Sequence, residues 1–139
     1  MNKPHASIHG TGVLLALLVL GLLLPSLQSQ AQEQITNATF TTALVGGQPT
    51  DYVQNIANSV REVYYYSEVA GLKGKTITHR WQREGEVKAE IKIRIDTDPA
   101  QAVSKLKLRP EWTGAWTVQT LDGSGKVIAE NSFAYLAPL

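Results

Sequence analysis

Apolar and charged residues alternate without exception along residues 87–95, near the middle of the chain. The apolar positions are Val87, Ala89, Ile91, Ile93 and Ile95, and the charged ones between them are Lys88, Glu90, Lys92 and Arg94. A two-residue period is typical of a strand with one face in a core and the other in water. Residues 76–83 are rich in β-branched and aromatic side chains, and Glu84-Gly85 follows them, so the two segments predict a β-hairpin.

The same alternation returns near the end of the chain. Residues 115–121 and 126–135 predict two strands, and Asp122-Gly123-Ser124-Gly125 between them predicts the turn of a second hairpin. The seven segments predicted as strands are residues 37–45, 61–69, 76–83, 87–95, 102–109, 115–121 and 126–135. Seven short strands with regular turns favour an all-β fold, a single antiparallel β-sandwich of immunoglobulin-like shape.

Residues 46–60 interrupt this series of strands. The sequence Gly-Gly-Gln-Pro at 46–49 breaks the chain after the first strand. Beyond it, Tyr52, Val53, Ile56 and Val60 recur at intervals of one to four residues. This spacing predicts either a short amphipathic helical turn or a crossover between two sheets.

Residues 1–31 have the pattern of a secretory signal peptide. Lys3 gives a positive start, residues 13–24 form an apolar run that Pro25 ends, and Ser29-Gln30-Ala31 supplies small residues for cleavage after Ala31. Residues 32–139 then form the all-β domain, and we expect it in the periplasm. The alternative is an uncleaved inner-membrane anchor, because residues 10–27 could span a thinned bilayer, and only in that case do we expect membrane contact.

Charge and composition exclude several classes of function. The chain has 13 basic and 12 acidic side chains, and Lys3 is the one charged residue before Glu33, so 12 of each sign follow the leader. A domain without net charge gives no electrostatic reason to expect nucleic-acid binding. The chain contains no cysteine, and His5 and His9 leave with the leader, so His79 is the only imidazole of the mature domain. We therefore expect neither a metal nor another cofactor.

Two stretches of the chain resemble a known family. They are REVYYYSEVAGLKGKTITHRW at residues 61–81 and GAWTVQTLDGSGKVIAENSFAY at residues 114–135. The most specific motifs are His79-Arg80-Trp81 and the later series Trp116, Val118, Asp122, Gly125 and Phe133. The chain resembles, over residues 61–135, the bacterial family catalogued as domain of unknown function 2914. The resemblance implies a small all-β domain outside the cytoplasm of Gram-negative bacteria, and it assigns no activity.

His79 is the residue of the predicted domain with the largest number of possible chemical roles. On a regular strand it shares a face with Ile77 and Trp81, which predicts a partly buried histidine bonded to a backbone carbonyl or a nearby hydroxyl. The alternatives are a ligand-binding or proton-relay group and a pH sensor. No serine lies in a nucleophile-elbow motif, so we predict no catalytic residue.

Exposed aromatic side chains are the other candidates. Tyr64 and Tyr66 share a strand face with Glu62 and Glu68, which predicts that both rings point outward and could hold a partner. A bulge would reverse the faces, and the family resemblance implies that Tyr66 is as plausible a core residue. Trp112 lies in a loop-like stretch, so it is either exposed or packed over the open end of the sandwich.

These candidates suggest a periplasmic, non-enzymatic binding or interaction module. Its partner would be a protein, a peptide or a glycan, held by some of four residues: Tyr64, Tyr66, His79 and Trp112. One alternative is a small hydrolase-like enzyme with His79 as general base. Another is a structural accessory subunit that pairs through a strand edge.

Overall fold

The computed structural model describes residues 1–4 and 34–139, so the predicted cleavage site after Ala31 lies outside the described residues. The described part of the chain is all-β, and it contains no helix that could span a membrane. Seven strands have eight to ten residues: β1 (Gln34–Thr41), β5 (Glu62–Ala70), β6 (Thr76–Arg83), β7 (Glu86–Arg94), β8 (Ala100–Lys107), β9 (Gly114–Leu121) and β10 (Val127–Leu136). Three are short: β2 (Leu44–Val45), β3 (Gln48–Pro49) and β4 (Asn55–Ala57).

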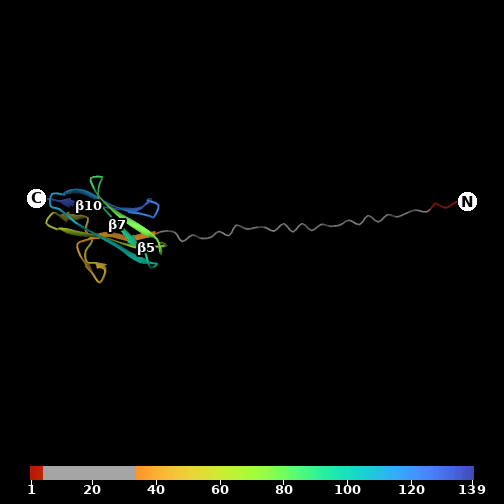
Figure 1. Ribbon diagram of the computed structural model, residues 1–139, viewed down its shortest axis with the longest axis horizontal. Helices are drawn as coiled ribbons and strands as arrows, with labels where there is room; N and C mark the ends of the chain where they lie inside the picture. Colours follow the sequence, from red (N-terminus) through yellow and green to blue (C-terminus); the bar gives the residue numbers. More distant parts are fainter. Residues whose placement is uncertain (5–33) are drawn as a thin grey trace.

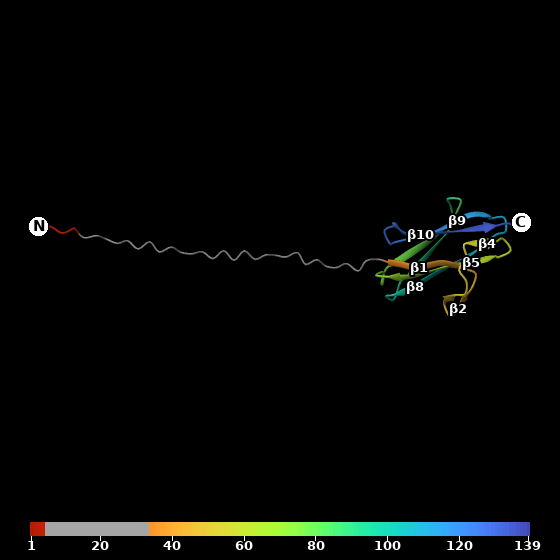
Figure 2. The same cartoon turned by 180° about the vertical axis from the view of Figure 1, so that it is seen from behind.

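The strands form two larger sheets and a small hairpin. One sheet has the order β1-β5-β8, the second has the order β4-β10-β9-β6-β7, and β2 pairs with β3. Figures 1 and 2 show β9 and β10 in one layer and β1, β5 and β8 in the other. All the pairings are antiparallel except that of β4 with β10, which is parallel. The prediction of a wholly antiparallel arrangement is wrong at this pair.

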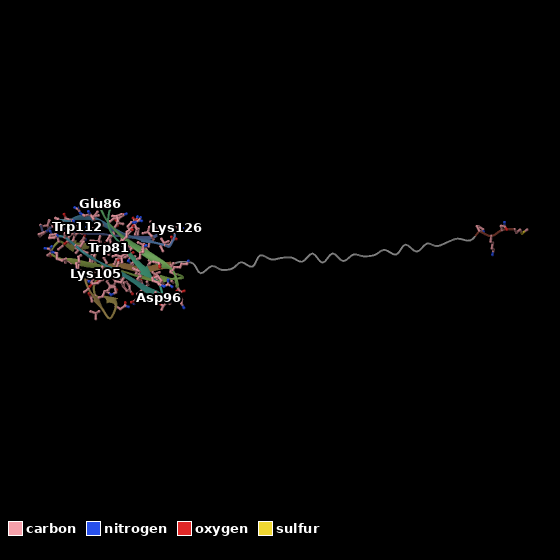
Figure 3. The ribbon with its side chains drawn as sticks, viewed as in Figure 1. Trp81, Glu86, Asp96, Lys105, Trp112 and Lys126 are labelled. Atoms are coloured by element: carbon pink, nitrogen blue, oxygen red, sulfur yellow. The ribbon has the colours of Figure 1, made fainter. Side chains whose placement is uncertain are left out.

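Aromatic side chains from both layers fill the space between the two sheets. The ring of Phe40 on β1 lies 4.7 Å from that of Phe133 on β10, and the ring of Tyr65 on β5 lies 6.4 Å from that of Trp81 on β6. All four residues are buried, and Figure 3 shows Trp81 in the interior of the domain. Because tilted and edge-on aromatic pairs add to the free energy of area burial, this cluster anchors the two sheets to each other.

Residues 46–60 differ from one of the two predictions made for them. They contain β3 and β4 and no helix, so the predicted helical turn is wrong. Ile56 is buried on β4, whereas Tyr52 is 77% exposed, so the apolar spacing does not mark one buried face. The segment carries the chain from β1 in the three-stranded sheet to β4 in the five-stranded sheet.

Candidate functional site

The β2–β3 hairpin covers part of the outer face of the three-stranded sheet. Figure 2 shows β2 on the side of β1 and β5 that faces away from β9 and β10. Gly46 and Gly47 form the turn with φ of 58° and 77°, a conformation that glycine adopts without steric cost. A Cβ atom at Gly47 would lie 3.3 Å from Oε1 of Gln101, so the tip of the hairpin reaches across the sheet to β8.

Asp51 fixes the base of this hairpin. Its Oδ1 accepts hydrogen bonds from the Thr41 hydroxyl at 2.5 Å and from the Thr42 backbone N–H at 2.7 Å, and its Oδ2 accepts one from the Thr42 hydroxyl. Desolvation acts to raise the pKa of Asp51, but the hydrogen bonds from Thr41 and Thr42 outweigh it and hold that pKa below its ordinary value. The carboxylate therefore ties the returning chain to the end of β1.

Tyr66 points outward from β5 but lies beneath the hairpin. It is only 2% exposed, and its hydroxyl lies 3.5 Å from Oε1 of Gln48 on β3 and 3.3 Å from Oε1 of Glu68. Burial, and after it the charge of Glu68, raises the pKa of Tyr66 above its ordinary value. The prediction that this ring is exposed is wrong, because a segment about 20 residues earlier in the sequence folds over it.

Two hollows lie on this outer face, and both are bordered by Glu68. The first has a volume of about 420 Å³, and its lining includes Asn37, Thr39, Pro49, Tyr52 and Tyr66. The second has a volume of about 530 Å³, and its lining includes Thr97, Pro99 and Gln101. We call the two hollows together the hairpin groove. Both volumes fall in the range of ordinary ligand sites, roughly 300–1,000 Å³.

Glu68 is held in place between the two hollows. Nδ2 of Asn37 donates a 2.7 Å hydrogen bond to its Oε2, and the Tyr66 hydroxyl approaches its Oε1. Asn37 reaches this position because the pairing of β1 with β5 shifts register between Thr36 and Thr39, where Asn37 has a φ of 50°. Asparagine tolerates this left-handed conformation better than most residues. The bulge therefore places a carboxamide over the sheet.

The hairpin groove offers hydrogen bonding and aromatic contact. Its lining side chains carry a carboxylate, carboxamides and hydroxyls, together with the exposed ring of Tyr52. Among the residues that the structure describes, no group of three histidine, aspartate or glutamate side chains could hold a metal ion. Such a lining suits reversible recognition of a polar ligand.

Tyr64 lies on the same outer face, outside the groove. It is half-buried, its hydroxyl donates a 2.9 Å hydrogen bond to Glu62, and Lys105 lies 5.7 Å from the centre of its ring. Lys105 also forms a 3.2 Å ion pair with Glu62. The two predicted tyrosines therefore point to the same side, as the alternation predicts, but they lie in different surroundings.

Trp112 lies at the end of the domain where the C-terminus is found (Figure 3). It is partly buried, its ring lies 5.9 Å from that of Trp116, and its carbonyl accepts a 2.9 Å hydrogen bond from Nε1 of Trp116. Lys88 and Arg109 lie 5.4 and 5.0 Å from the centre of the ring. Cations of the chain itself therefore occupy the surroundings of this ring, and the structure separates it from the tyrosine candidates.

His79 is inside the core and has no access to the hairpin groove. It is 0% exposed, its Nδ1 lies 2.8 Å from the hydroxyl of Ser104, and the Tyr65 ring lies edge-on at 4.8 Å. Burial lowers the pKa of His79 to about 4. Within the described part of the chain, Nε2 of this histidine has no hydrogen-bond partner.

Sequence reasoning missed most of the groove. The sequence singles out Tyr66 as a candidate and uses Glu68 as a sign that its strand face is exposed, but it does not predict Asn37, Gln48 or Tyr52 as site residues. The glycine-rich turn at 46–49 is the signal that could have found the rest, since it predicts a hairpin with a tyrosine shortly after it.

Comparisons with known proteins identify a family and no activity. No curated protein matches this chain. One similar solved structure, a crystal structure of an engineered protein, aligns with 79% of this chain at 13% identity and a TM-score of 0.41. This chain spans 20% of the length of that protein. The similarity is too low to support a statement about fold or function.

The family match covers the C-terminal half of the described domain. Residues 74–135 match the family described as "Protein of unknown function (DUF2914)". The match begins later than the predicted 61–135, and most residues of the hairpin groove lie before it. The resemblance expected from the sequence is confirmed over residues 74–135, where the chain is similar to this family of proteins of unknown function.

Proposed function

We propose that the domain is a non-enzymatic binding module and that the hairpin groove is its binding site. The observation that carries this proposal is the position of Tyr52, which is 77% exposed at the border of a polar hollow. An exposed aromatic ring beside convergent polar groups is a common feature of binding sites. The partner would be a protein, a peptide or a glycan.

The burial of His79 supports binding over the hydrolase-like alternative. A general base must reach the proton that it removes, directly or through one water. His79 is fully covered, and its Nδ1 is engaged by Ser104. A substrate in the groove would be separated from it by β5.

The edge of β7 gives less support to pairing with a partner strand. β7 is one of the two edge strands of the five-stranded sheet, and the charged residues Lys88, Glu90, Lys92 and Arg94 occupy alternate positions along it. Its pairing with β6 shifts register between Trp81 and Gln82. Charged side chains and a bulge are the devices by which natural edge strands avoid further pairing.

We also propose that the two sheets form an immunoglobulin-like sandwich. The orders β1-β5-β8 and β4-β10-β9-β6-β7 correspond to strands A-B-E facing A′-G-F-C-C′ of that fold. The buried Trp81 on β6 supports the assignment, because immunoglobulin domains bury a tryptophan on strand C. In these terms the β2–β3 hairpin is an addition between A and A′.

We further propose that the protein is exported to the periplasm and cleaved after Ala31. The support for this is the pattern of the first 31 residues, a positive start, an apolar run and small residues at the cleavage site. N-terminal sequencing of protein recovered from the periplasmic fraction should begin at Gln32. Recovery only in the membrane fraction, with residue 1 intact, would support the anchored alternative.

The groove can be tested without knowing its ligand. A glycan array and a peptide library are screened with the purified protein, and every ligand found is retested on Gln48→Trp and Gln101→Trp, which place a large side chain in the hollows. Both positions are exposed, so we expect the fold to persist. Lys126→Trp, at an exposed turn outside the groove, is the matched control.

The proposal predicts ligands that bind the native protein and Lys126→Trp alike and bind the two groove variants at least roughly tenfold more weakly. Ligands that bind all four proteins equally would place the site elsewhere. The finding of no ligand in either collection, or turnover of small esters that His79→Gln abolishes, would also contradict the proposal.

A further inference from the structure

Glu68 retains hydrogen-bonding capacity toward a ligand. Its two carboxylate oxygens offer about four lone-pair sites, and Asn37 and Tyr66 each engage one oxygen. Because Glu68 borders both hollows, the remaining sites can accept hydrogen bonds from hydroxyl groups placed on either side of it.

Charge in the groove favours a neutral ligand. Among the described residues that line the two hollows, Glu68 is the one charged side chain. Without a lysine or arginine in the lining, a phosphate or carboxylate group would meet only repulsion from this glutamate. A single ammonium group would gain little, because an exposed ion pair is weak in water.

The other lining groups complement a ring that carries several hydroxyls. The carboxamides of Asn37 and Gln48 can both donate and accept, and the exposed ring of Tyr52 adds an apolar surface next to Pro49. A pyranose ring has an apolar face of C–H groups and a rim of hydroxyls, so it can use both kinds of contact at once. An aromatic ring gives this contact area with few rotatable bonds to fix.

We propose that the hairpin groove binds a neutral carbohydrate, with a sugar ring packed on Tyr52 and its hydroxyls bonded to Glu68, Asn37 and Gln48. This inference rests on the proposed function, because it names the ligand class of the same site. Glu68 acts as the acceptor at the centre of the groove, and the β2–β3 hairpin supplies Gln48 and Pro49 at its border.

The test is a titration of the purified protein with neutral disaccharides, followed by amide chemical shifts. The probes are cellobiose, maltose, lactose, mannobiose and N,N′-diacetylchitobiose, each up to about 10 mM, a range that detects binding with a Kd on the order of 1 mM. Inorganic phosphate and a neutral tetrapeptide are tested in parallel. We expect at least one sugar to shift the amides of residues 37–39, 48–52 and 66–68.

Variants then assign the contacts. Tyr52→Ala, at an exposed position, should weaken sugar binding by roughly tenfold or more, and Glu68→Gln, which removes acceptor sites, should weaken it by roughly fivefold. Tyr64→Ala is the matched control, because Tyr64 lies on the same face outside the groove, and its Kd should equal that of the native protein. Equal loss in Tyr64→Ala and Tyr52→Ala would overturn the assignment.

The outcomes separate this inference from the proposed function. If the tetrapeptide or a library peptide shifts the groove amides and no sugar does, the carbohydrate proposal is overturned and the binding module stands. If neither these probes nor the array and library ligands shift those amides, both proposals fail. Stronger binding of phosphate than of any sugar would also overturn the carbohydrate proposal.

Discussion

Ser104 on β8 and His79 on β6 join the two sheets inside the core, with the serine Oγ 2.8 Å from Nδ1 of the histidine. The same Oγ accepts a 3.0 Å hydrogen bond from Nε1 of Trp81. One small side chain of the three-stranded sheet therefore satisfies two buried polar groups of the five-stranded sheet.

Ser104→Ala removes only one oxygen atom, but it should destabilise the domain strongly. It leaves His79 and Trp81 each with a buried nitrogen that has lost its partner, at about 1–3 kcal/mol per group, so we expect a loss of about 2–6 kcal/mol. Urea unfolding measures this change. Ser132→Ala is the control, since Ser132 bonds Thr117 at an exposed site and should change stability by less than about 0.5 kcal/mol.

His79 should make stability depend on pH between about 4 and 6.5. The folded pKa is about 4, whereas the unfolded chain titrates near 6.5, so in this window the unfolded state binds a proton that the folded state excludes. Stability therefore falls as pH falls from 6.5 to 4, by about 3 kcal/mol. His79→Gln cannot titrate, and it should lack this part of the slope. Parallel curves for the two proteins would contradict the burial of a neutral histidine.

Gly114→Ala should destabilise the domain, because both the backbone conformation and a side-chain contact at this position oppose a Cβ atom. Gly114 has a φ of 124°, and a Cβ there would collide with the carboxylate of Glu84, which accepts a 2.8 Å hydrogen bond from the N–H of Ala115. We expect a loss of about 1–3 kcal/mol in thermal or urea unfolding. Gly123→Ala is the matched control: its added Cβ would meet Thr76 O at an ordinary 3.8 Å. Equal effects of the two substitutions would contradict this account.

Asp51→Asn should loosen the β2–β3 hairpin while leaving the two large sheets intact. The amide has one acceptor oxygen where the carboxylate has two, so it cannot keep all the bonds from Thr41 and Thr42. We expect faster hydrogen exchange at the N–H groups of Thr50 and Val53, which bond Ala43 and Phe40 across the base of the hairpin.

Asp96→Asn is the control for this experiment. The Asp96 carboxylate forms a 3.1 Å ion pair with Arg94, and both side chains are well exposed. Exposed pairs contribute little, so exchange at Thr50 and Val53 should not change. If Asp51→Asn instead accelerated exchange throughout β9 and β10, Asp51 would support the whole fold and not the hairpin.

The two-residue period predicted the strands of the core well. Residues 76–83 are a strand with the predicted bounds, and the side chains of Ile77, His79 and Trp81 all lie in the core. This part succeeds because alternation is a local property that a single strand carries by itself.

The hairpin groove could not be predicted in the same way. Alternation correctly places Tyr66 on the outer face, but it says nothing about a second segment that covers that face. The cover comes from Gln48 and its neighbours, whose two-residue strands are too short to show a period. The spacing that includes Tyr52 predicts an amphipathic helical turn or a crossover, whereas tertiary structure leaves this ring in solvent.

The parallel pairing of β4 with β10 determines when the domain can be completed. Tyr135 lies opposite Ile56, and its hydroxyl donates hydrogen bonds to the carbonyls of Asn58 at 3.0 Å and Val60 at 2.7 Å. These partners are separated by 75 or more residues of sequence. A ribosome or a translocation channel that still holds β10 therefore keeps β4 without its neighbour, so this part of the fold must wait until β10 has emerged.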